Sequence, residues 1–264
     1  MNNTTPTRFR SLRPGAAALV VVLGMITSVG FAATTGQETQ TMSLTQTTAP
    51  HPSATLDARR QAILPIAAFA AAGDIDHLKT ALTQGLDAGL TVSDCKEILV
   101  QLYAYAGFPR SLNALTALMQ VLDARKATGT YDPAGREPGS LPAPDKMLEV
   151  GTANQTKLTG VPVSGPLFEF SPQVDRCLKE HLFGAIFARD NLDWKNRELA
   201  TVGFLSALPG AESQLQSHMR ISMNVGLTAG QLQQAVQVLD QRAGADYGRR
   251  AHEALAQVFA ASTR

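Results

Sequence analysis

Apolar residues recur every three or four positions over much of the chain, which is the spacing of one face of an α-helix. The first such stretch ends at Gly73 and the second at Gly89, and a glycine directly after a helical pattern is a typical C-terminal cap. Thr91 stands where an N-cap belongs, ahead of a third amphipathic stretch at 92–105. The pattern therefore predicts three successive helices. Their apolar faces are marked by Ile63, Ile66, Ala67, Ala70, Leu78, Leu82 and Leu86.

The same pattern returns 137 residues later in the chain. The segment 87–107 aligns without a gap on 224–244, and a third helix at 229–242 matches the one at 92–105. Self-similarity at a constant offset is typical of a duplicated unit. Matched positions are Arg60 and Arg197, Gly73 and Gly210, Leu78 and Leu215, Gly89 and Gly226, Thr91 and Thr228, and Gly107 and Gly244. We expect an all-α protein with two tandem three-helix units, at 56–125 and 173–264.

The segment between the two units, residues 126–172, is rich in proline and glycine and has no sustained period. It is too long for a turn, so we expect it to pack across the surface or to line a pocket, with disorder as the alternative. Packing is favoured by the apolar residues Leu148, Leu158, Val161, Leu167, Phe168 and Phe170.

The N-terminal residues 1–32 have the composition of a secretory signal peptide. Three arginines, Arg8, Arg10 and Arg13, precede an apolar run that ends in small residues at Ala32. An uncleaved anchor helix is the alternative, because the run is about long enough to span a bilayer. Residues 33–55 are polar and rich in threonine, which predicts a flexible linker. We expect a periplasmic or secreted protein without a stable membrane anchor after cleavage.

Composition narrows the partners of this chain. The net charge is +1, so nothing predicts binding to nucleic acid or to an anionic membrane. Aromatic residues make up 6%, which favours closely packed helices over a sheet sandwich.

The two cysteines, Cys95 and Cys177, could form a bridge in an oxidising compartment, whereas a buried small apolar residue is the alternative for Cys95. The sequence contains no CxxC motif and no Cys/His spacing of a metal site, so it predicts neither a redox dithiol nor a bound metal.

Two segments, LTVSDCKEILVQLYAYAGFPRSLNAL at 90–115 and LDWKNRELATVGFLSALPGAESQLQSHMRISMNVGLT at 192–228, resemble the carboxymuconolactone decarboxylase family. The resemblance covers most of 60–125 and 173–250. It implies a helical bundle of the type shared with alkyl hydroperoxidase D. Single-unit members assemble as trimers or hexamers, so the resemblance also implies a homo-oligomer, a trimer of two-unit chains.

Glu198 and His218 match the glutamate and the histidine of the family motif. The thiol-reductase branch of the family carries two cysteines where this chain has PGAES at 209–213. The reacting thiolate is therefore missing, and the resemblance implies the decarboxylase branch, which uses no metal and no organic cofactor. The matching positions of the first unit hold Gln61 and Ala81, so the acid–base pair belongs to the second unit alone.

Histidine exchanges protons near neutral pH because its free pKa is about 6.5, and a glutamate in an apolar pocket can be raised toward that range. The break at 209–210 folds the helix of Glu198 back on the helix of His218, but spacing does not decide whether the two side chains meet. A helix-dipole role for Glu198 and a semi-buried packing role for His218 are the alternatives.

Further polar residues are weaker candidates. Arg197 could bind a substrate carboxylate, with a structural ion pair as an equal alternative. His181 could line the pocket, with a surface position as the alternative. Glu97, which unit two replaces by glutamine, is interpreted as a structural or interface carboxylate, and Tyr103 and Tyr105 as packing or subunit-contact residues.

The function that the resemblance implies is cofactor-free proton transfer or decarboxylation, a lyase-type reaction, on a small carboxylated or lactone-type substrate. Two alternatives belong to other classes. A thiol-dependent peroxidase would require a reactive Cys95 or Cys177. A non-catalytic oligomeric protein that binds a small molecule would account for the degenerate first unit.

Overall fold

A computed structural model describes residues 55–262, and every regular element in this range is a helix. The prediction of an all-α protein is confirmed. The predicted signal peptide 1–32 and all but the last residue of the predicted linker 33–55 lie outside the described residues. The helices are α1 Ala58–Ala72, α2 Ile75–Asp87, α3 Val92–Gln101, α4 Tyr103–Ala127, η1 Pro144–Lys146, α5 Met147–Thr159, α6 Pro166–Phe170, α7 Pro172–Cys177, η2 Leu178–Ile186, α8 Trp194–Ser206, α9 Glu212–Asn224, α10 Ala229–Arg242 and α11 Ala245–Ser262.

The helix ends follow the capping residues of the sequence. Thr91 and Thr228 are N-caps, and each closes a capping box with the residue three positions later. Gly73 takes the left-handed conformation after α1, with φ of 75°. The bounds of α2 and α9 lie 137 residues apart, as do the starts of α3 and α10. That the halves are two copies of one family unit stays a prediction.

The expected third helix of the first half is shorter than 92–105. α3 ends at Gln101, and α4 changes direction at Gly107, where φ is 80° and ψ is 163°. A side chain at such a positive φ would be strained, so glycine allows the chain to turn here. Each half then continues into a long helix that the three-helix prediction omitted, α4 and α11.

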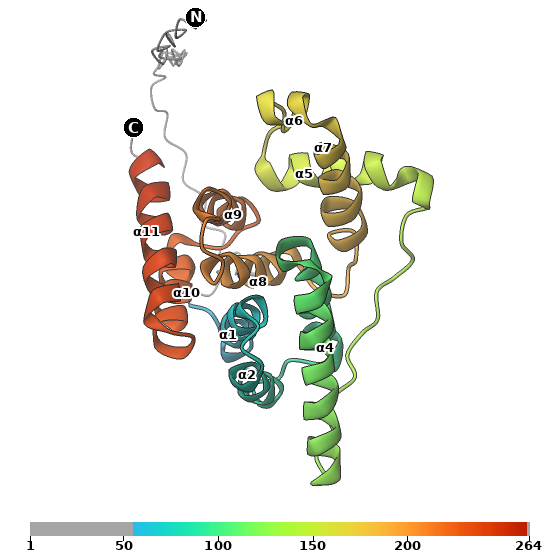
Figure 1. Ribbon diagram of the computed structural model, residues 1–264, viewed down its shortest axis with the longest axis vertical. Coiled ribbons are helices and arrows are strands. Elements are labelled where there is room, and N and C mark those ends of the chain that lie inside the picture. The colour runs from blue at the N-terminus through green and yellow to red at the C-terminus, as the bar shows by residue number, and fades with distance from the viewer. Residues whose placement is uncertain (1–54, 263–264) are drawn as a thin grey trace, which may run out of the picture. The chain divides into compact units, whose positions relative to one another are not determined.

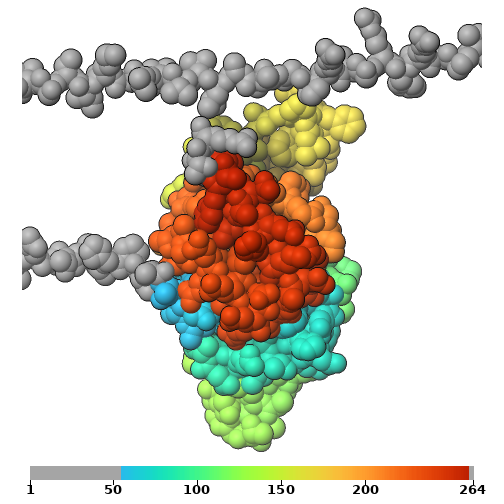
Figure 2. Space-filling view, turned by 90° about the vertical axis from the view of Figure 1, so that its left-hand side faces the viewer, coloured from blue at the N-terminus to red at the C-terminus, as the bar shows by residue number. Residues whose placement is uncertain are grey.

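The core is built around α1 and α8, which lie against each other with the other core helices around them (Figure 1). Both helices are buried on nearly all sides; α1 is mostly apolar, whereas α8 also buries polar side chains, among them Arg197 and Glu198. Gly203 allows the close approach, because a Cβ there would lie 2.7 Å from the Cβ of Ala67 and 2.8 Å from the carbonyl oxygen of Leu64. The C-terminal helix α11, red in Figure 2, lies over the face seen in that view.

The segment between the halves packs on the rest of the chain, and it contains a helix, α5, that the sequence pattern did not reveal. α5 is close enough to the π-helix η2 that a Cβ on Gly151 would lie 1.8 Å from the carbonyl oxygen of Lys179. Its buried face uses Gly151, Gln155 and Leu158 instead of a stripe of large apolar side chains. This composition explains why the hydrophobic periodicity is weak.

Most of the residues expected to anchor this segment do not do so. Leu158 is fully buried and Phe168 is partly buried. The others are exposed in the described chain: Leu148, Val161, Leu167 and Phe170. The start of the segment is instead held by backbone hydrogen bonds, in which Val92 and Ser93 donate to the carbonyl oxygens of Pro133 and Ala134. Exposed apolar residues here were indistinguishable from core residues in the sequence.

A second, smaller apolar cluster lies beside the main core. It consists of Leu158, Leu182, Phe183, Ile186, Phe187 and Ile221, and we call it the η2 cluster. Tyr105 packs against both the main core and the η2 cluster. No helix within residues 55–262 combines the length and the apolar character that a membrane span requires.

We predict that Gly203→Ala destabilises the fold. The added methyl group would collide with the backbone of α1, and overpacking of this kind costs about 1–3 kcal/mol, which exceeds the gain of roughly 1 kcal/mol in helix propensity. Chemical denaturation of the wild type and the variant measures the change. Gly230→Ala, at an exposed position of α10, is the control and should not lower the free energy of unfolding. Equal stability of Gly203→Ala and the wild type would contradict the packing argument.

Candidate functional site

Glu198 and His218 meet in the structure. The N-cap Asp193 accepts a hydrogen bond from the backbone N–H of Asn196, which starts α8 and places Glu198 in the second turn of this helix. Gly210, with φ of 86°, turns the chain into α9, and His218 lies midway along this second helix. The Nδ1 atom of His218 lies 2.9 Å from Oε2 of Glu198. The hairpin thus brings the two predicted residues within hydrogen-bond distance.

The pair is buried. Glu198 has no exposed surface and His218 is 8% exposed. The second carboxylate oxygen of Glu198, Oε1, is buried and has no hydrogen-bond partner among the described residues. A buried carboxylate oxygen without a partner is costly, and such groups are rare in folded proteins. This atom therefore marks a place where the hydrogen-bond donor of a ligand would be stabilised.

Tyr105, in α4 of the first half, also lies beside the Glu198–His218 pair. Its ring meets the ring of His218 edge-on, with 5.7 Å between the centroids, and its hydroxyl oxygen accepts a hydrogen bond from Thr201 at 3.2 Å. Burial and the nearby Glu198 carboxylate raise the pKa of Tyr105 well above its ordinary value. The phenol therefore keeps its proton and remains a donor.

From the sequence, Tyr105 was predicted to be a packing or subunit-contact residue. No spacing along the chain relates Tyr105 to His218, because the two residues meet only through the packing of α4 against α8 and α9. Its place in the YAGFPRSLNAL segment was the only available signal.

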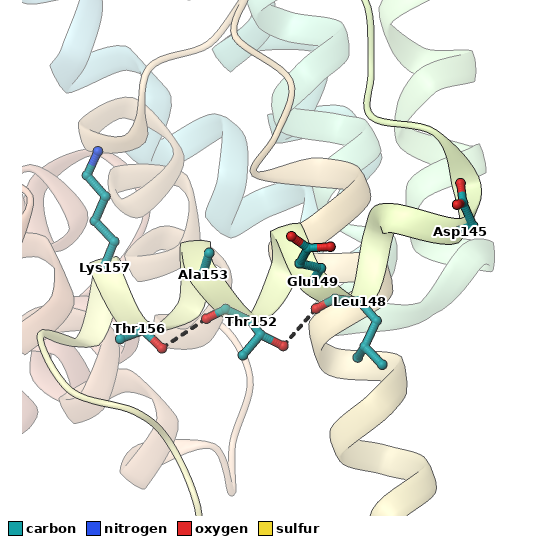
Figure 3. Close-up of a pocket in the computed structure, with 7 residues that line it drawn as sticks. All are labelled: Asp145, Leu148, Glu149, Thr152, Ala153, Thr156 and Lys157. Carbon is teal, nitrogen blue, oxygen red and sulfur yellow. Dashed lines mark hydrogen bonds between the residues drawn. The ribbon is translucent and has the colours of Figure 1, made fainter.

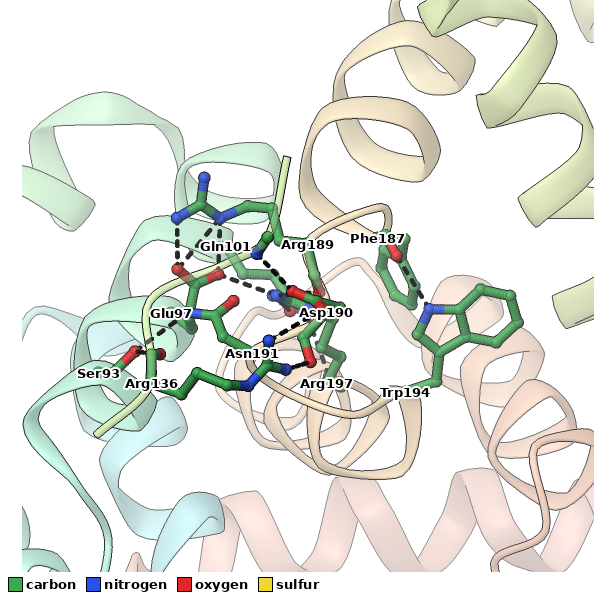
Figure 4. Close-up of polar contacts among 11 residues, drawn as sticks. Ser93, Glu97, Gln101, Arg136, Phe187, Arg189, Asp190, Asn191, Trp194 and Arg197 are labelled. Carbon is green, nitrogen blue, oxygen red and sulfur yellow. Dashed lines mark hydrogen bonds and ion pairs between the residues drawn. The ribbon is translucent and has the colours of Figure 1, made fainter. Parts of the chain in front are cut away.

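Arg197, the neighbour of Glu198, is fully buried in an ion pair. Its Nη2 lies 2.9 Å from Oε2 of Glu97, and Nη1 donates to Gln101 at 3.3 Å. Arg189 binds both oxygens of the same carboxylate, so two guanidinium groups converge on Glu97 (Figure 4). The structure thus places Arg197 in the structural ion pair that was the alternative to substrate binding. A substrate carboxylate would have to compete with Glu97 for it.

The Glu97 carboxylate is held in its ionised form. Burial alone would raise its pKa, but hydrogen bonds from Arg189, Arg197 and Asn191 outweigh this effect and lower the pKa to about 2. The network continues through Gln101, whose side-chain N–H donates to the hydroxyl of Thr201 at 2.8 Å. A continuous set of polar contacts therefore links α3 and α4 to α8 next to the Glu198–His218 pair.

We predict that Glu97→Gln lowers the free energy of unfolding near neutral pH by about 3–5 kcal/mol, the usual cost of leaving a buried charge unpaired. The pKa of Glu97 is depressed in the folded state, so its contribution is present above the unfolded pKa of about 4.3 and is lost as the pH falls toward 2. Denaturation at pH 7 and at pH 3 measures both effects.

The stability difference between the wild type and Glu97→Gln should shrink at the lower pH. A difference that stays constant between pH 7 and pH 3 would contradict the depressed pKa. Lys146, in an exposed pair with Glu149, provides the control, and Lys146→Met should change stability little at either pH.

His181 lies at the surface of η2 and makes no described contact with Glu198 or His218. This exposed position agrees with the alternative that His181 is a surface residue. A role for His181 in the pocket stays a prediction for which the contacts within this chain provide no support.

The two cysteines are free. Cys95 is buried and Cys177 is exposed, so the possible disulfide between them is not formed in the structure. Burial, together with the carboxylates of Asp94 and Asp132, raises the pKa of Cys95 to about 12. This thiol is therefore held in its unreactive form. Within residues 55–262, no three histidine, cysteine, aspartate or glutamate side chains are grouped closely enough to hold a metal ion.

We predict that a thiol reagent modifies one cysteine of the native protein, Cys177, and both after unfolding. Cys177→Ser should then show no rapid labelling in the native state, whereas Cys95→Ser should be labelled like the wild type. Mass spectrometry of the labelled protein measures the stoichiometry. Rapid modification of Cys95 in the folded protein would contradict its burial and raised pKa.

A hollow of about 740 Å³ follows the outer side of α5, away from the Glu198–His218 pair, and is lined by residues such as Thr152, Ala153 and Thr156 (Figure 3). A second hollow of about 480 Å³ lies where α5 meets α8 and α9. We place the candidate active site at the buried pair because it holds proton-exchanging groups in contact, which the open surface of α5 does not.

Residues 172–259, from α7 into α11, match the family model described as the carboxymuconolactone decarboxylase family. The match includes Glu198 and His218 and confirms the family resemblance for this part of the chain. It does not extend to residues 56–125, so the first family unit stays a prediction. A comparison with curated proteins gave no match.

Proposed function

We propose, from the premise that residues 172–259 form a domain of the carboxymuconolactone decarboxylase family, that Glu198 and His218 transfer protons on a small carboxylated or lactone-type substrate. The family supports a function of the decarboxylase or alkyl hydroperoxidase D type in general terms. The observation that carries the narrower proposal is the contact of 2.9 Å between two buried groups able to exchange protons.

The two residues have separable roles. The Glu198 contact favours a proton on Nδ1 of His218, so Nε2 is the nitrogen left to exchange a proton with a ligand. When this imidazole is protonated, the Glu198 carboxylate balances its charge in surroundings where an isolated charge would be costly. Histidine thus acts as the general acid or base, and glutamate orients and stabilises it.

In a decarboxylation, the bond from the substrate carbon to its carboxylate breaks and carbon dioxide leaves. The electron pair moves into the conjugated lactone carbonyl as an enolate, and protonated His218 then delivers its Nε2 proton to carbon. The phenol of Tyr105 retains its proton and is a donor beside the same imidazole. The step balances without an external oxidant or reductant, and we propose that it uses no metal or organic cofactor.

The thiol-peroxidase alternative has less support. That chemistry needs a reactive thiolate, and Cys95 is buried with a raised pKa, whereas Cys177 is exposed without a second cysteine beside it. Pro209 to Ser213 occupy the positions where the reductase branch of the family carries its cysteines.

We also propose that the protein is exported and acts as a homo-oligomer, a trimer of two-unit chains. The composition of residues 1–32 supports export. Exposed apolar side chains, among them Phe108 at 63% and Phe170 at 89%, support association with further copies.

We predict that His218→Ala and Glu198→Gln each lower kcat by about 10²–10⁴-fold, the usual contribution of a positioned general acid or base. The assay follows release of carbon dioxide from 4-carboxymuconolactone and related unsaturated lactone carboxylates. Circular dichroism and size-exclusion chromatography should show that both variants keep the fold and the assembly of the wild type.

His252→Ala, which removes an exposed histidine of α11, is the control and should retain full activity. Tyr105→Phe tests the phenol separately, because it keeps the ring packing and removes the donor. Full activity of His218→Ala, or a wild type that releases no carbon dioxide from any of these substrates, would refute the proposal.

A further inference from the structure

A hollow of about 480 Å³ lies beside the first turn of α8, where α5 and the end of α9 meet it. Three cationic side chains line it: Arg60, Lys157 and Lys195. Asp193 is the carboxylate of the lining. Its size lies within the range of about 300–1,000 Å³ that is typical of small-molecule sites.

The positive charge of this hollow is incompletely balanced. Arg60 is shared between Asp57 and Asp193, at the long distances of 3.9 Å and 3.8 Å. Among residues 55–262, neither Lys157 nor Lys195 forms an ion pair with a carboxylate. Like charges gathered at one site repel one another, so an anion bound between them would be stabilised.

One wall of the hollow is apolar and well fixed. The indole N–H of Trp194 donates to the carbonyl oxygen of Phe187 at 3.0 Å, and the ammonium of Lys157 lies 5.0 Å from the centre of its ring. Trp194 and Val225 also pack against the η2 cluster. This wall is therefore a rigid apolar surface next to two ammonium groups.

The edges of the hollow are held together across three helices. Asn224, at the end of α9, donates from its side chain to the carbonyl oxygen of Leu158 in α5 at 3.1 Å. The ring contact between Lys157 and Trp194 links α5 to α8. The lining residues are thus positioned by tertiary contacts, as in a preformed site.

We propose that this hollow binds a small organic carboxylate, with its charge between Lys157 and Lys195 and its hydrophobic body against Trp194 and Val225. Neither Glu198 nor His218 lines the hollow. The site is therefore distinct from the buried pair, and it does not require the catalytic role proposed for that pair.

Trp194 is the single tryptophan of the chain, so its intrinsic fluorescence reports directly on the hollow. The experiment titrates the full-length protein with cyclohexanecarboxylate and with its neutral counterpart cyclohexanecarboxamide, neither of which absorbs the exciting light. We expect a saturable change with the carboxylate and binding about tenfold or more weaker with the amide, the loss expected for a charge-assisted contact.

Lys195→Met should weaken carboxylate binding about tenfold or more for the same reason, whereas Lys126→Met, at an exposed position near the end of α4, removes the same charge and should leave binding unchanged. Calorimetric titration of the same variants checks the result independently of the fluorescence. Equal affinity for acid and amide, unchanged affinity in Lys195→Met, or equal losses in both lysine variants would overturn the proposal.

Glu198→Gln separates this site from the proposed catalytic one. We expect this variant to bind cyclohexanecarboxylate with the affinity of the wild type, whatever its turnover. Loss of the fluorescence response in Glu198→Gln would place the ligand at the Glu198–His218 pair and would overturn the proposal of a separate site.

Discussion

The buried ion pair between Glu97 and Arg197 is the interaction on which the site depends. It joins α3 of the first half to α8 of the second, and Arg197 is the residue next to Glu198. Removing two charges from water is expensive unless further hydrogen bonds satisfy them, and here Arg189 and Gln101 supply such bonds. Contacts with the first half of the chain therefore fix the rotation of α8 about its axis, and this rotation sets the direction of the Glu198 side chain.

The two halves of the chain therefore contribute different residues to the same candidate site. The second half contributes Glu198 and His218, whereas the first half contributes Tyr105 beside His218, and Glu97 and Gln101, which bind the neighbouring Arg197. The first half lacks the pair itself, because Gln61 and Ala81 stand at the matching positions. The proposed reaction therefore needs only one such pair in the chain, and the first half supports it through Glu97, Gln101 and Tyr105.

Local signals in the sequence were sufficient to predict the helical fold and many of the helix ends. Thr91 and Thr228 cap their helices through hydrogen bonds with the residue three positions later, and Gly73 does so through its left-handed conformation. Such local signals depend on few distant residues. The site was less predictable, because the contact of Glu198 with His218 depends on how two helices are rotated against each other. For the same reason, the sequence did not reveal the contact of Tyr105 with His218, and it did not decide between the two alternative roles of Arg197. Burial of apolar residues was also hard to predict. Leu158 is buried and Phe170 is exposed, and only the tertiary structure distinguishes them.

Two buried carboxylates lie at the same arginine network, and they differ in the groups around them: Glu97 is bound within the network, and Glu198 is the sequence neighbour of Arg197. Glu97 accepts hydrogen bonds from two guanidinium groups, and its pKa is held at about 2, so it stays ionised across the physiological range. Glu198 has one hydrogen-bond partner among the described side chains, His218, and one of its oxygens has no donor. A carboxylate whose oxygens are bound by two guanidinium groups has a structural role, whereas one with a histidine partner and one free oxygen can also accept a hydrogen bond from a ligand. This difference in partners, and not burial itself, assigns the structural role to Glu97 and supports the chemical role proposed for Glu198.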